Sequence, residues 1–444
     1  MLIEFRVSNY RSIGEEQILS LIPAPRQKEY MDNIVFNGKH NALNAIAIYG
    51  ANGSGKSNLL LAMGLLDKLI YLSARSTSTT KLPYDPFLLR EGWDSRPTKF
   101  EITFIINDNR YRYGLEFKKE EIVSEWLYRK SQGREVILFL REGETIDASS
   151  GLKGNPKIID AAIEATRSNA LFLSTCDMFN VEEAKIIFQW FKHFNKIDGI
   201  DTEDEEIRTV SMWDNETDRD DIVQYILRLN LGLDGIDISK KDFDEKDLPK
   251  NIDSKTRNLL IKKLSDSQSY SVQAIHKMYS SDGMETGKNL FWNFDERESK
   301  GTNKALHLSG PILWALKNGG VLIIDEIEAK MHPLLTLDTI KIFLSKERNP
   351  NNAQLIFATH DTNLLTYSEL RRDQIYFTEK NKWESTEIYS LSDFIYLDKN
   401  GSSKIEKERP DTDKEKRYFE GRYGAIPFLG SFKGLKSNTN GKKG

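Results

Sequence analysis

Residues 50–57 have the composition of a phosphate-binding loop. Gly50, Gly55, Lys56 and Ser57 fill every fixed position of the pattern G-x-x-x-x-G-K-[ST]. Glycines let backbone N–H groups point at phosphate oxygens, a lysine neutralises the β- and γ-phosphates, and a serine hydroxyl binds Mg²⁺. The alternative is an ordinary glycine-rich turn before a helix. We predict that ATP is bound by Asn52, Gly53, Ser54, Gly55, Lys56, Ser57 and Asn58.

Asp325 and Glu326 form a second candidate site, because they follow the apolar run 321–324. A buried strand that ends in two acids can offer one carboxylate to Mg²⁺ and the other to the water that attacks the γ-phosphate. We expect Asp325 to bind Mg²⁺ opposite Ser57 and Glu326 to act as the general base. Neighbouring strand residues point to opposite faces, so the chain must turn at this pair. The alternative is a strand capped by solvated acids.

His360 follows another apolar run, residues 354–358. A histidine at the end of that strand can hydrogen-bond the γ-phosphate. We therefore expect His360 to join Glu326 and Lys56 as a catalytic residue. A histidine with a structural role is the alternative.

Ser299, Gly301 and Thr302 stand just before a predicted helix over residues 304–316. The N-terminus of a helix attracts an anion. One chain has no evident use for a second anion site, so we predict that these residues bind the γ-phosphate held by a second copy of the chain. The alternative is a loop that caps its own helix.

The elements around these motifs predict an α/β fold. Residues 45–49 read as a buried strand, and residues 58–72 have helical spacing. Residues 107–109 suit a hairpin turn. Residues 2–8 alternate apolar and polar side chains as a half-buried strand does. Strand-like runs that indicate an antiparallel sheet beside the nucleotide site lie at residues 99–106, 110–117, 126–129 and 136–141.

The rest of the chain is expected to be helical in the middle and α/β at its end. We predict helices over residues 158–165, 181–194, 220–231, 254–264 and 333–345, an acidic loop over 198–221, and strands over 269–279, 354–358 and 374–378. The chain then divides into residues 1–150 with the phosphate loop and antiparallel sheet, a helical insertion at 151–268, the C-terminal half of the head at 269–432, and a disordered tail at 433–444.

The composition excludes some classes of protein. The mean hydropathy is −0.52, and the sequence shows no apolar run of membrane-spanning length and no signal core at its start. A single cysteine, Cys176, suits a reducing cytoplasm, where we expect the protein to be, away from membranes. A net charge of −4 does not indicate a nucleic-acid binder, although a local basic stripe would be enough to bind one.

Taken together, these residues resemble the ABC-ATPase superfamily, in the branch of SMC, RecF-like and OLD-family proteins. Residues 9–12 (NYRS) are similar to that branch's N-[FY]-[RK]-[SCG] element, residues 299–302 to its short signature motif, and residues 325–333 to its Walker B segment and D-loop. The resemblance implies an ABC-type nucleotide-binding head with a parallel core sheet, and an Arg11 near the nucleotide. The chain departs from the usual D-loop at Lys330 and Met331.

The runs at 371–377, 389–394 and 421–427 (GRYGAIP) resemble the RloA/AbiL-type abortive-infection ATPases of bacteria. That resemblance implies a dimer or larger homo-oligomer that hydrolyses ATP and controls a separately encoded effector, of the RloB type or a TOPRIM-like nuclease, in defence against phage. OLD proteins carry a TOPRIM nuclease after the ATPase. The residues past 401 are too few for one, so we do not expect a nuclease in this chain.

Two other functions stay open. A DNA-repair or DNA-clamp ATPase of the RecF or SMC kind is one, although no sustained heptad repeat of an SMC arm is present. The ATPase subunit of a membrane transporter is the other. The NYRS opening and the lack of a full LSGGQ signature weigh against it.

Overall fold

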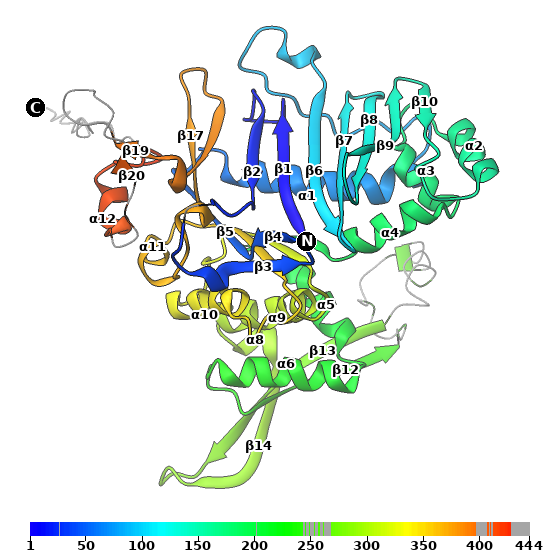
Figure 1. Cartoon of the computed structure of the whole chain (residues 1–444). Helices are drawn as coiled ribbons and strands as arrows, with labels where there is room; N and C mark the ends of the chain where they lie inside the picture. The colour runs from blue at the N-terminus through cyan, green and yellow to red at the C-terminus, as the bar shows by residue number, and fades with distance from the viewer. Residues whose placement is uncertain are drawn as a thin grey trace, which may run out of the picture.

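The computed structural model describes residues 1–25, 27–200, 202–242, 268–396 and 412–427, with isolated positions at 245, 248, 253, 256–257, 261, 406–407 and 409. These residues form two large sheets, one mainly parallel with six strands and one antiparallel with seven (Figure 1). Helix α1 (Lys56–Leu72) contacts strands of both sheets. The predicted α/β fold, with a parallel core sheet and an antiparallel subdomain, is confirmed.

The parallel sheet has the strand order β11-β15-β16-β5-β17-β18, and only its last pair is antiparallel. The carboxyl ends of parallel strands meet at one edge, so segments far apart in sequence come together there. The strands are β5 (Ala45–Gly50), β11 (Phe194–Asp198), β15 (Val321–Asp325), β16 (Gln354–Ala358), β17 (Ile375–Lys380) and β18 (Thr386–Ser390).

Strand β5 is buried along its whole length because the sheet is covered on both faces. Ile46 and Ile48 pack into the core that contains α1, whereas Ala47 and Tyr49 pack into the opposite core with residues of α9 (Lys300–Asn318). Successive side chains of a strand point to opposite faces, so a strand between two layers of helices is apolar throughout.

The antiparallel sheet has the order β10-β9-β8-β7-β6-β1-β2. Its predicted hairpin turn is confirmed, since Asn107 and Asp108 have φ angles of 47° and 63°, as a type I′ turn requires. Its strands are β1 (Leu2–Ser8), β2 (Gln17–Ser20), β6 (Thr98–Ile106), β7 (Asn109–Phe117), β8 (Ile122–Lys130), β9 (Val136–Glu142) and β10 (Thr145–Ala148).

One helical stretch, Lys56–Arg75, has the length and apolar composition of a membrane span. We did not expect such a stretch from the sequence. Its first turn is part of the phosphate loop, and Leu59, Leu60 and Leu66 are fully buried in the core between the sheets. In this structure it is therefore a core helix.

The middle of the chain is not the purely helical insertion that we predicted. The predicted helix over 181–194 ends at Phe191, and residues 194–198, for which we predicted no strand, form β11, which pairs with β15 at the edge of the core sheet. The predicted acidic loop instead contains two helices and a connection. The helices of this region are α2 (Pro156–Ala165), α3 (Phe172–Met178), α4 (Glu182–Phe191), α5 (Glu203–Met212) and α6 (Glu216–Arg228). The predicted helix over 254–264 falls largely outside the described residues.

A third sheet forms an arm that projects from the body (Figure 1). It consists of β12 (Gly235–Asp242), β13 (Gln268–Tyr279) and β14 (Glu285–Asn293), and nearly every side chain of β14 is exposed. The arm leads into α8 (Phe294–Arg297) and then α9. It therefore joins the insertion to the helix that starts at the predicted signature element.

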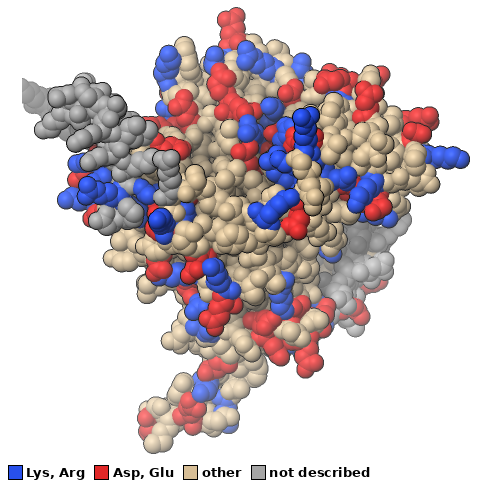
Figure 2. Space-filling model, in the orientation of Figure 1, with Lys and Arg blue, Asp and Glu red and all other residues tan. Residues whose placement is uncertain are grey.

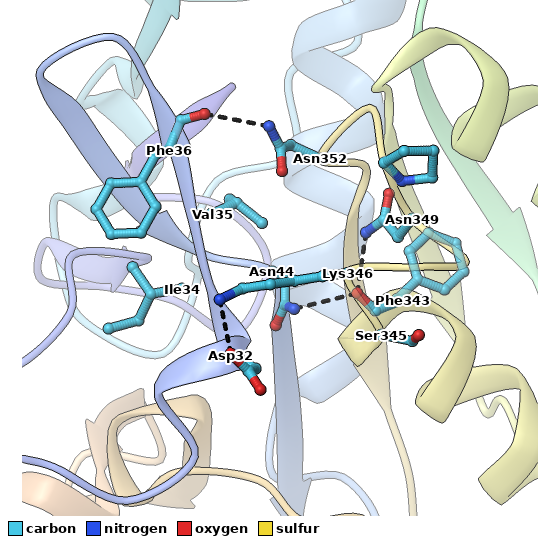
Figure 3. Close-up of a pocket in the computed structure, with 11 residues that line it drawn as sticks. Asp32, Ile34, Val35, Phe36, Asn44, Phe343, Ser345, Lys346, Asn349 and Asn352 are labelled. Atoms are coloured by element: carbon cyan, nitrogen blue, oxygen red, sulfur yellow. Dashed lines mark hydrogen bonds and ion pairs between the residues drawn. The ribbon is translucent and has the colours of Figure 1, made fainter.

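A small hairpin of β3 (Ile34–Asn37) and β4 (His40–Leu43) covers one end of the core sheet. Between it and the end of α10 (Pro333–Leu344) lies a cavity of about 250 Å³ (Figure 3). Asn44 and Asn349 both donate to the carbonyl of Phe343, at 3.1 and 2.9 Å. Most of the polar side chains drawn there bind another residue of the cavity wall, and no residue of the phosphate loop lines the cavity.

Two short helices lie in the last part of the chain, α11 (Asn363–Tyr367) between β16 and β17, and α12 (Lys414–Phe419) after β18. Tyr418 of α12 stacks on Phe377 of β17, with ring centroids 5.7 Å apart. The GRYGAIP segment then returns to the core sheet, where the hydroxyl of Tyr389 donates to the carbonyl of Tyr423 at 2.9 Å. The predicted tail, residues 433–444, lies outside the described residues.

Candidate nucleotide site

The phosphate loop connects β5 to α1 at the carboxyl edge of the core sheet. Gly53 and Gly55 have φ angles of 78° and 115°, a region that glycine enters without strain. A Cβ at Gly55 would lie 2.1 Å from Oγ1 of Thr386, so no larger residue fits there. Ser54 shares a hydrogen bond of 2.6 Å with Thr378. The end of β17 and the start of β18 therefore hold the loop in shape.

Lys56 is buried at the first turn of α1. Its ammonium donates to the carbonyls of Gly50 at 2.8 Å and Ala51 at 3.3 Å. Burial lowers the pKa of Lys56 to about 8, although the negative charges of Asp325 and Glu326 act in the opposite direction. The lysine thus lies among the predicted site residues while its hydrogen bonds go to its own loop.

Asp325 and Glu326 lie where the sequence predicts a turn. Asp325 is the last residue of β15, and Glu326 has a φ of 47°, which is uncommon for a residue with a side chain. Oδ1 of Asp325 is buried and accepts no hydrogen bond from the described residues. A buried carboxylate oxygen of this kind is one that a metal ion satisfies, so Asp325 fits the predicted Mg²⁺ ligand. The exposed Ser57 on α1 offers a hydroxyl as a second ligand.

His360 is held by a residue that our sequence analysis did not single out. The carboxylate of Glu328 accepts from the backbone N–H of His360 at 2.6 Å and from the hydroxyl of Thr359 at 2.7 Å. Partial burial and the positive charge of Lys56 lower the pKa of His360. The charges of Asp325 and Glu328 act on both Lys56 and His360, which places these side chains in one site.

Lys304 is a second residue that the sequence analysis missed. It is 2% exposed, and its ammonium donates to the carbonyls of Ile327 at 2.9 Å and Ala329 at 2.7 Å. The loop after Glu326 is therefore bound to α9. Nothing in the sequence marks this lysine, since its partners are backbone atoms.

The signature element lies at the start of α9, which begins four residues earlier than predicted. Oγ of Ser299 accepts from the backbone N–H of Thr302 at 3.1 Å and contacts the Thr302 hydroxyl at 2.8 Å. A Cβ at Gly301 would lie 2.7 Å from the carbonyl of Lys330. Among the described residues, no hydrogen bond joins this element to residues 50–57. Binding to a second copy stays a prediction.

The N-terminal element contacts the phosphate loop through Ser12. The amide of Asn58 donates to the Ser12 hydroxyl at 2.7 Å, and that hydroxyl lies 2.9 Å from the hydroxyl of Thr386. The neighbouring Arg11 instead pairs with Asp85 at 2.9 Å. The structure therefore brings Ser12 to the loop, and the role of Arg11 toward a nucleotide stays a prediction.

A cavity of about 380 Å³ opens beside the phosphate loop. One wall is residues 51–54, a second is the β17–β18 hairpin at residues 378–380 and Glu384, and the third is residues 425–427 of the GRYGAIP segment. The GRYGAIP segment therefore lies next to the residues predicted to bind phosphate.

The strand–loop–helix around Gly55 and the carboxylates at the end of β15 define a P-loop nucleotide-binding protein. The chain belongs to the family described as "AAA domain, putative AbiEii toxin, Type IV TA system", whose model matches residues 45–151 and 214–366. The matched segments contain the phosphate loop, the signature element, Glu326 and His360. The narrower resemblance to RloA/AbiL-type ATPases is not resolved by this match.

Among solved structures, the chain is similar to the SMC head domain from Thermotoga maritima, with 11% identity and a TM-score of 0.39, over 88% of this chain and 98% of that one. It is also similar to the structure described as the recombination mediator protein RecF-ATPrS in the RecFOR pathway, with 13% identity and a TM-score of 0.32, over 87% of this chain and 98% of that one. No curated protein matches the sequence.

Proposed function

We propose that this protein is an ATP-hydrolysing switch that works as a dimer of nucleotide heads and controls a separate effector in bacterial defence against phage. The observation that carries the proposal is the single site formed by Lys56, Asp325, Glu326 and His360 at the carboxyl edge of the core sheet. ATP bound by residues 50–58 would place its γ-phosphate among these side chains.

Each of these residues has a chemical role toward bound ATP. Lys56 leaves the loop carbonyls and neutralises the β- and γ-phosphates. Ser57 and Asp325 would hold Mg²⁺, which supplies charge neutralisation when it is bound. Glu326 orients the attacking water and accepts its proton. His360, positioned by Glu328, hydrogen-bonds the γ-phosphate.

The dimer explains the location of the signature element. Ser299 lies at the N-terminus of a long helix, which favours an anion, yet its own chain provides no bond from it to the phosphate loop among the described residues. In a two-fold dimer each Ser299 can close the partner's site. ATP then joins the heads and hydrolysis separates them, which is a change that an effector can detect.

The test mixes two inactive variants. Ser299→Arg has an intact phosphate loop and a blocked signature element, and Lys56→Ala has the reverse. Neither alone should hydrolyse ATP, whereas an equal mixture should, since a dimer of one chain of each kind carries one complete site. Ser281→Arg, on the exposed tip of the arm, is the control for an added arginine. Normal hydrolysis by Ser299→Arg alone would exclude the composite site.

The defence role is supported by the family description, which names a putative toxin. Affinity capture with the Glu326→Gln variant and ATP should retain the effector, and capture with Lys56→Ala should not. A RecF- or SMC-like role in DNA repair is the second candidate. The face shown in Figure 2 has basic and acidic residues interspersed and no basic stripe, so it does not favour that role.

A further inference from the structure

Three side chains outside the nucleotide site converge from three helices. Glu206 lies on α5, Asp295 on α8 and His307 on α9. One ligand atom from each lies within 4.8 Å of the other two, and Nε2 of His307 is 3.8 Å from Oδ1 of Asp295. We propose that these side chains bind a divalent transition-metal cation of the Zn²⁺ class.

The distances between the three side chains suit such a cation after a small closure. A tetrahedral Zn²⁺ with bonds of about 2.1 Å places its ligand atoms about 3.4 Å apart. The His307–Asp295 pair is within a few tenths of an ångström of that value. The side chain of Asp295 is 57% exposed on the four-residue helix α8, so it can turn toward the other two.

The two buried ligands are oriented by neighbours. Nδ1 of His307 lies 3.1 Å from the hydroxyl of buried Thr202. In the tautomer whose Nδ1–H donates to Thr202, Nε2 carries the lone pair that a metal requires. The hydroxyl of Tyr270 donates to Oε2 of Glu206 at 3.2 Å. Second-layer contacts of this kind are typical of metal sites.

The cluster borders a cavity of about 710 Å³, which has room for water as a fourth ligand. Asn303 also lines this cavity, and its buried Oδ1 accepts no hydrogen bond from the described residues. That oxygen can accept from a metal-bound water. The site therefore has three protein ligands, a place for a solvent ligand and an acceptor for its hydrogen.

The lining of the cavity is mixed in charge, so selection of a cation depends on the three ligand side chains themselves. Four carboxylates line the cavity, those of Glu206, Asp295, Glu296 and Glu298, against the ammonium groups of Lys300, Lys304 and Lys330. Two of the three lysines, Lys304 and Lys330, donate to backbone carbonyls. Glu298 accepts from His276 and Trp292 and stays out of the cluster.

The cation would join α5 and α8 to α9, the helix that starts at Ser299 and carries Lys304 behind the Glu326 loop. An influence of the metal on hydrolysis rests on the proposed function. Binding of the metal does not, so the experiment measures binding and stability in the absence of nucleotide.

The test titrates Zn²⁺ into the untagged, metal-stripped full chain and follows calorimetric heat and the thermal midpoint. We expect one Zn²⁺ per chain and a raised midpoint. Asp295→Asn, at an exposed position that keeps the fold, should weaken binding about tenfold or more, and His307→Gln should abolish it. Glu296→Gln removes the same charge from α8 without removing a ligand and should bind as the wild type does.

A further variant separates this site from the nucleotide site. Asp325→Asn should retain Zn²⁺ binding, because Asp325 belongs to the predicted Mg²⁺ site. The proposal is overturned if the wild-type chain binds no Zn²⁺, if Asp295→Asn binds as tightly as Glu296→Gln, or if the bound metal is lost in Asp325→Asn and retained in Asp295→Asn. None of these results depends on hydrolysis, so the proposed function can fail or stand independently.

Discussion

Lys56 must carry a proton to bind phosphate, and its pKa of about 8 brings the loss of that proton close to neutral pH. Below pH 8 the ammonium is charged, and above it the neutral amine cannot attract ATP. We expect the dissociation constant for ATP, measured by calorimetry, to rise about tenfold between pH 7 and pH 9, because about one lysine in ten stays charged at pH 9.

The control for this prediction is Lys56→Ala, which should bind ATP weakly and equally at both pH values. An affinity of the wild type that is constant from pH 7 to pH 9 would show that the lysine keeps its proton.

Asp67 is a partly buried acid on α1, and its buried Oδ1 accepts no hydrogen bond from the described residues. Burial raises its pKa from 3.8 to about 7. From pH 4 to 7 the unfolded chain loses this proton first, so the free energy of unfolding falls as pH rises, and above 7 the full cost of a buried charge is present. In urea unfolding, the free energy of unfolding of Asp67→Asn relative to the wild type should therefore increase by about 3 kcal/mol from pH 5 to pH 8.

Asp160→Asn, which removes an exposed acid from α2, is the matched control and should show no such gain. Equal pH dependence of unfolding in Asp67→Asn and the wild type would mean that Asp67 finds a partner or water in solution.

At the scale of single residues, the sequence predicts the residues that would contact ATP better than the residues that hold them in place. Lys56, Asp325 and Glu326 belong to local motifs, so residue type and spacing are enough to identify them. Glu328 was visible in the same segment, but its contact with Thr359 and His360 depends on strand pairing. The positive φ of Glu326 follows from how the chain leaves the sheet, which no residue type indicates.

At the scale of elements, β11 sits so close to β15 that its exit requires glycine. A Cβ at Gly199 would lie 2.1 Å from the carbonyl of Asp325 and 2.5 Å from that of Glu326. Both contacts are with backbone, which cannot move aside cheaply. Gly199→Ala should destabilise the protein by about 3 kcal/mol in urea unfolding and reduce ATP hydrolysis, because the Glu326 loop is displaced.

Gly64→Ala is the control, since its Cβ would meet no backbone atom and would lie 3.3 Å from Cβ and Cγ of Lys196, a contact that a shift of a few tenths of an ångström relieves. Alanine favours a helix over glycine by about 1 kcal/mol, so this variant should be neutral or more stable. Wild-type stability and hydrolysis in Gly199→Ala would show that β11 can shift away from β15 at little cost.

The same strand shows where prediction of elements fails. Residues 194–198 (FNKID) are partly polar because β11 is an edge strand, so no continuous apolar run separates them from α4. The acidic residues of α5 and α6 suit a solvated loop as well as the exposed face of a helix, where acids in the first turn are favourable. By contrast, β5, β15 and β16 lie between two layers, and their apolar runs were unambiguous.

At the scale of the whole molecule, the proposed dimer should depend on bound ATP. Glu326→Gln keeps the shape of the side chain and loses the base, so ATP should bind and persist. Analytical ultracentrifugation should then show a dimer with ATP and Mg²⁺ and a monomer with ADP. Lys56→Ala should stay monomeric with either nucleotide. A mass of Glu326→Gln that does not change with ATP would contradict pairing through the nucleotide heads.

The position of β5 also has a consequence for synthesis on the ribosome. This strand is made early, but its sheet neighbours β16 and β17 come from residues 354–380. Thr386, whose hydroxyl donates to the carbonyl of Ser54 in the phosphate loop, is made later still. At about 5–20 residues per second, the backbone N–H and C=O groups of β5 stay unpaired and its apolar side chains stay uncovered for most of translation. An unpaired apolar strand associates with other chains. A ribosome that stalls before residue 380 therefore presents a nascent chain that has no ATP site and needs a chaperone.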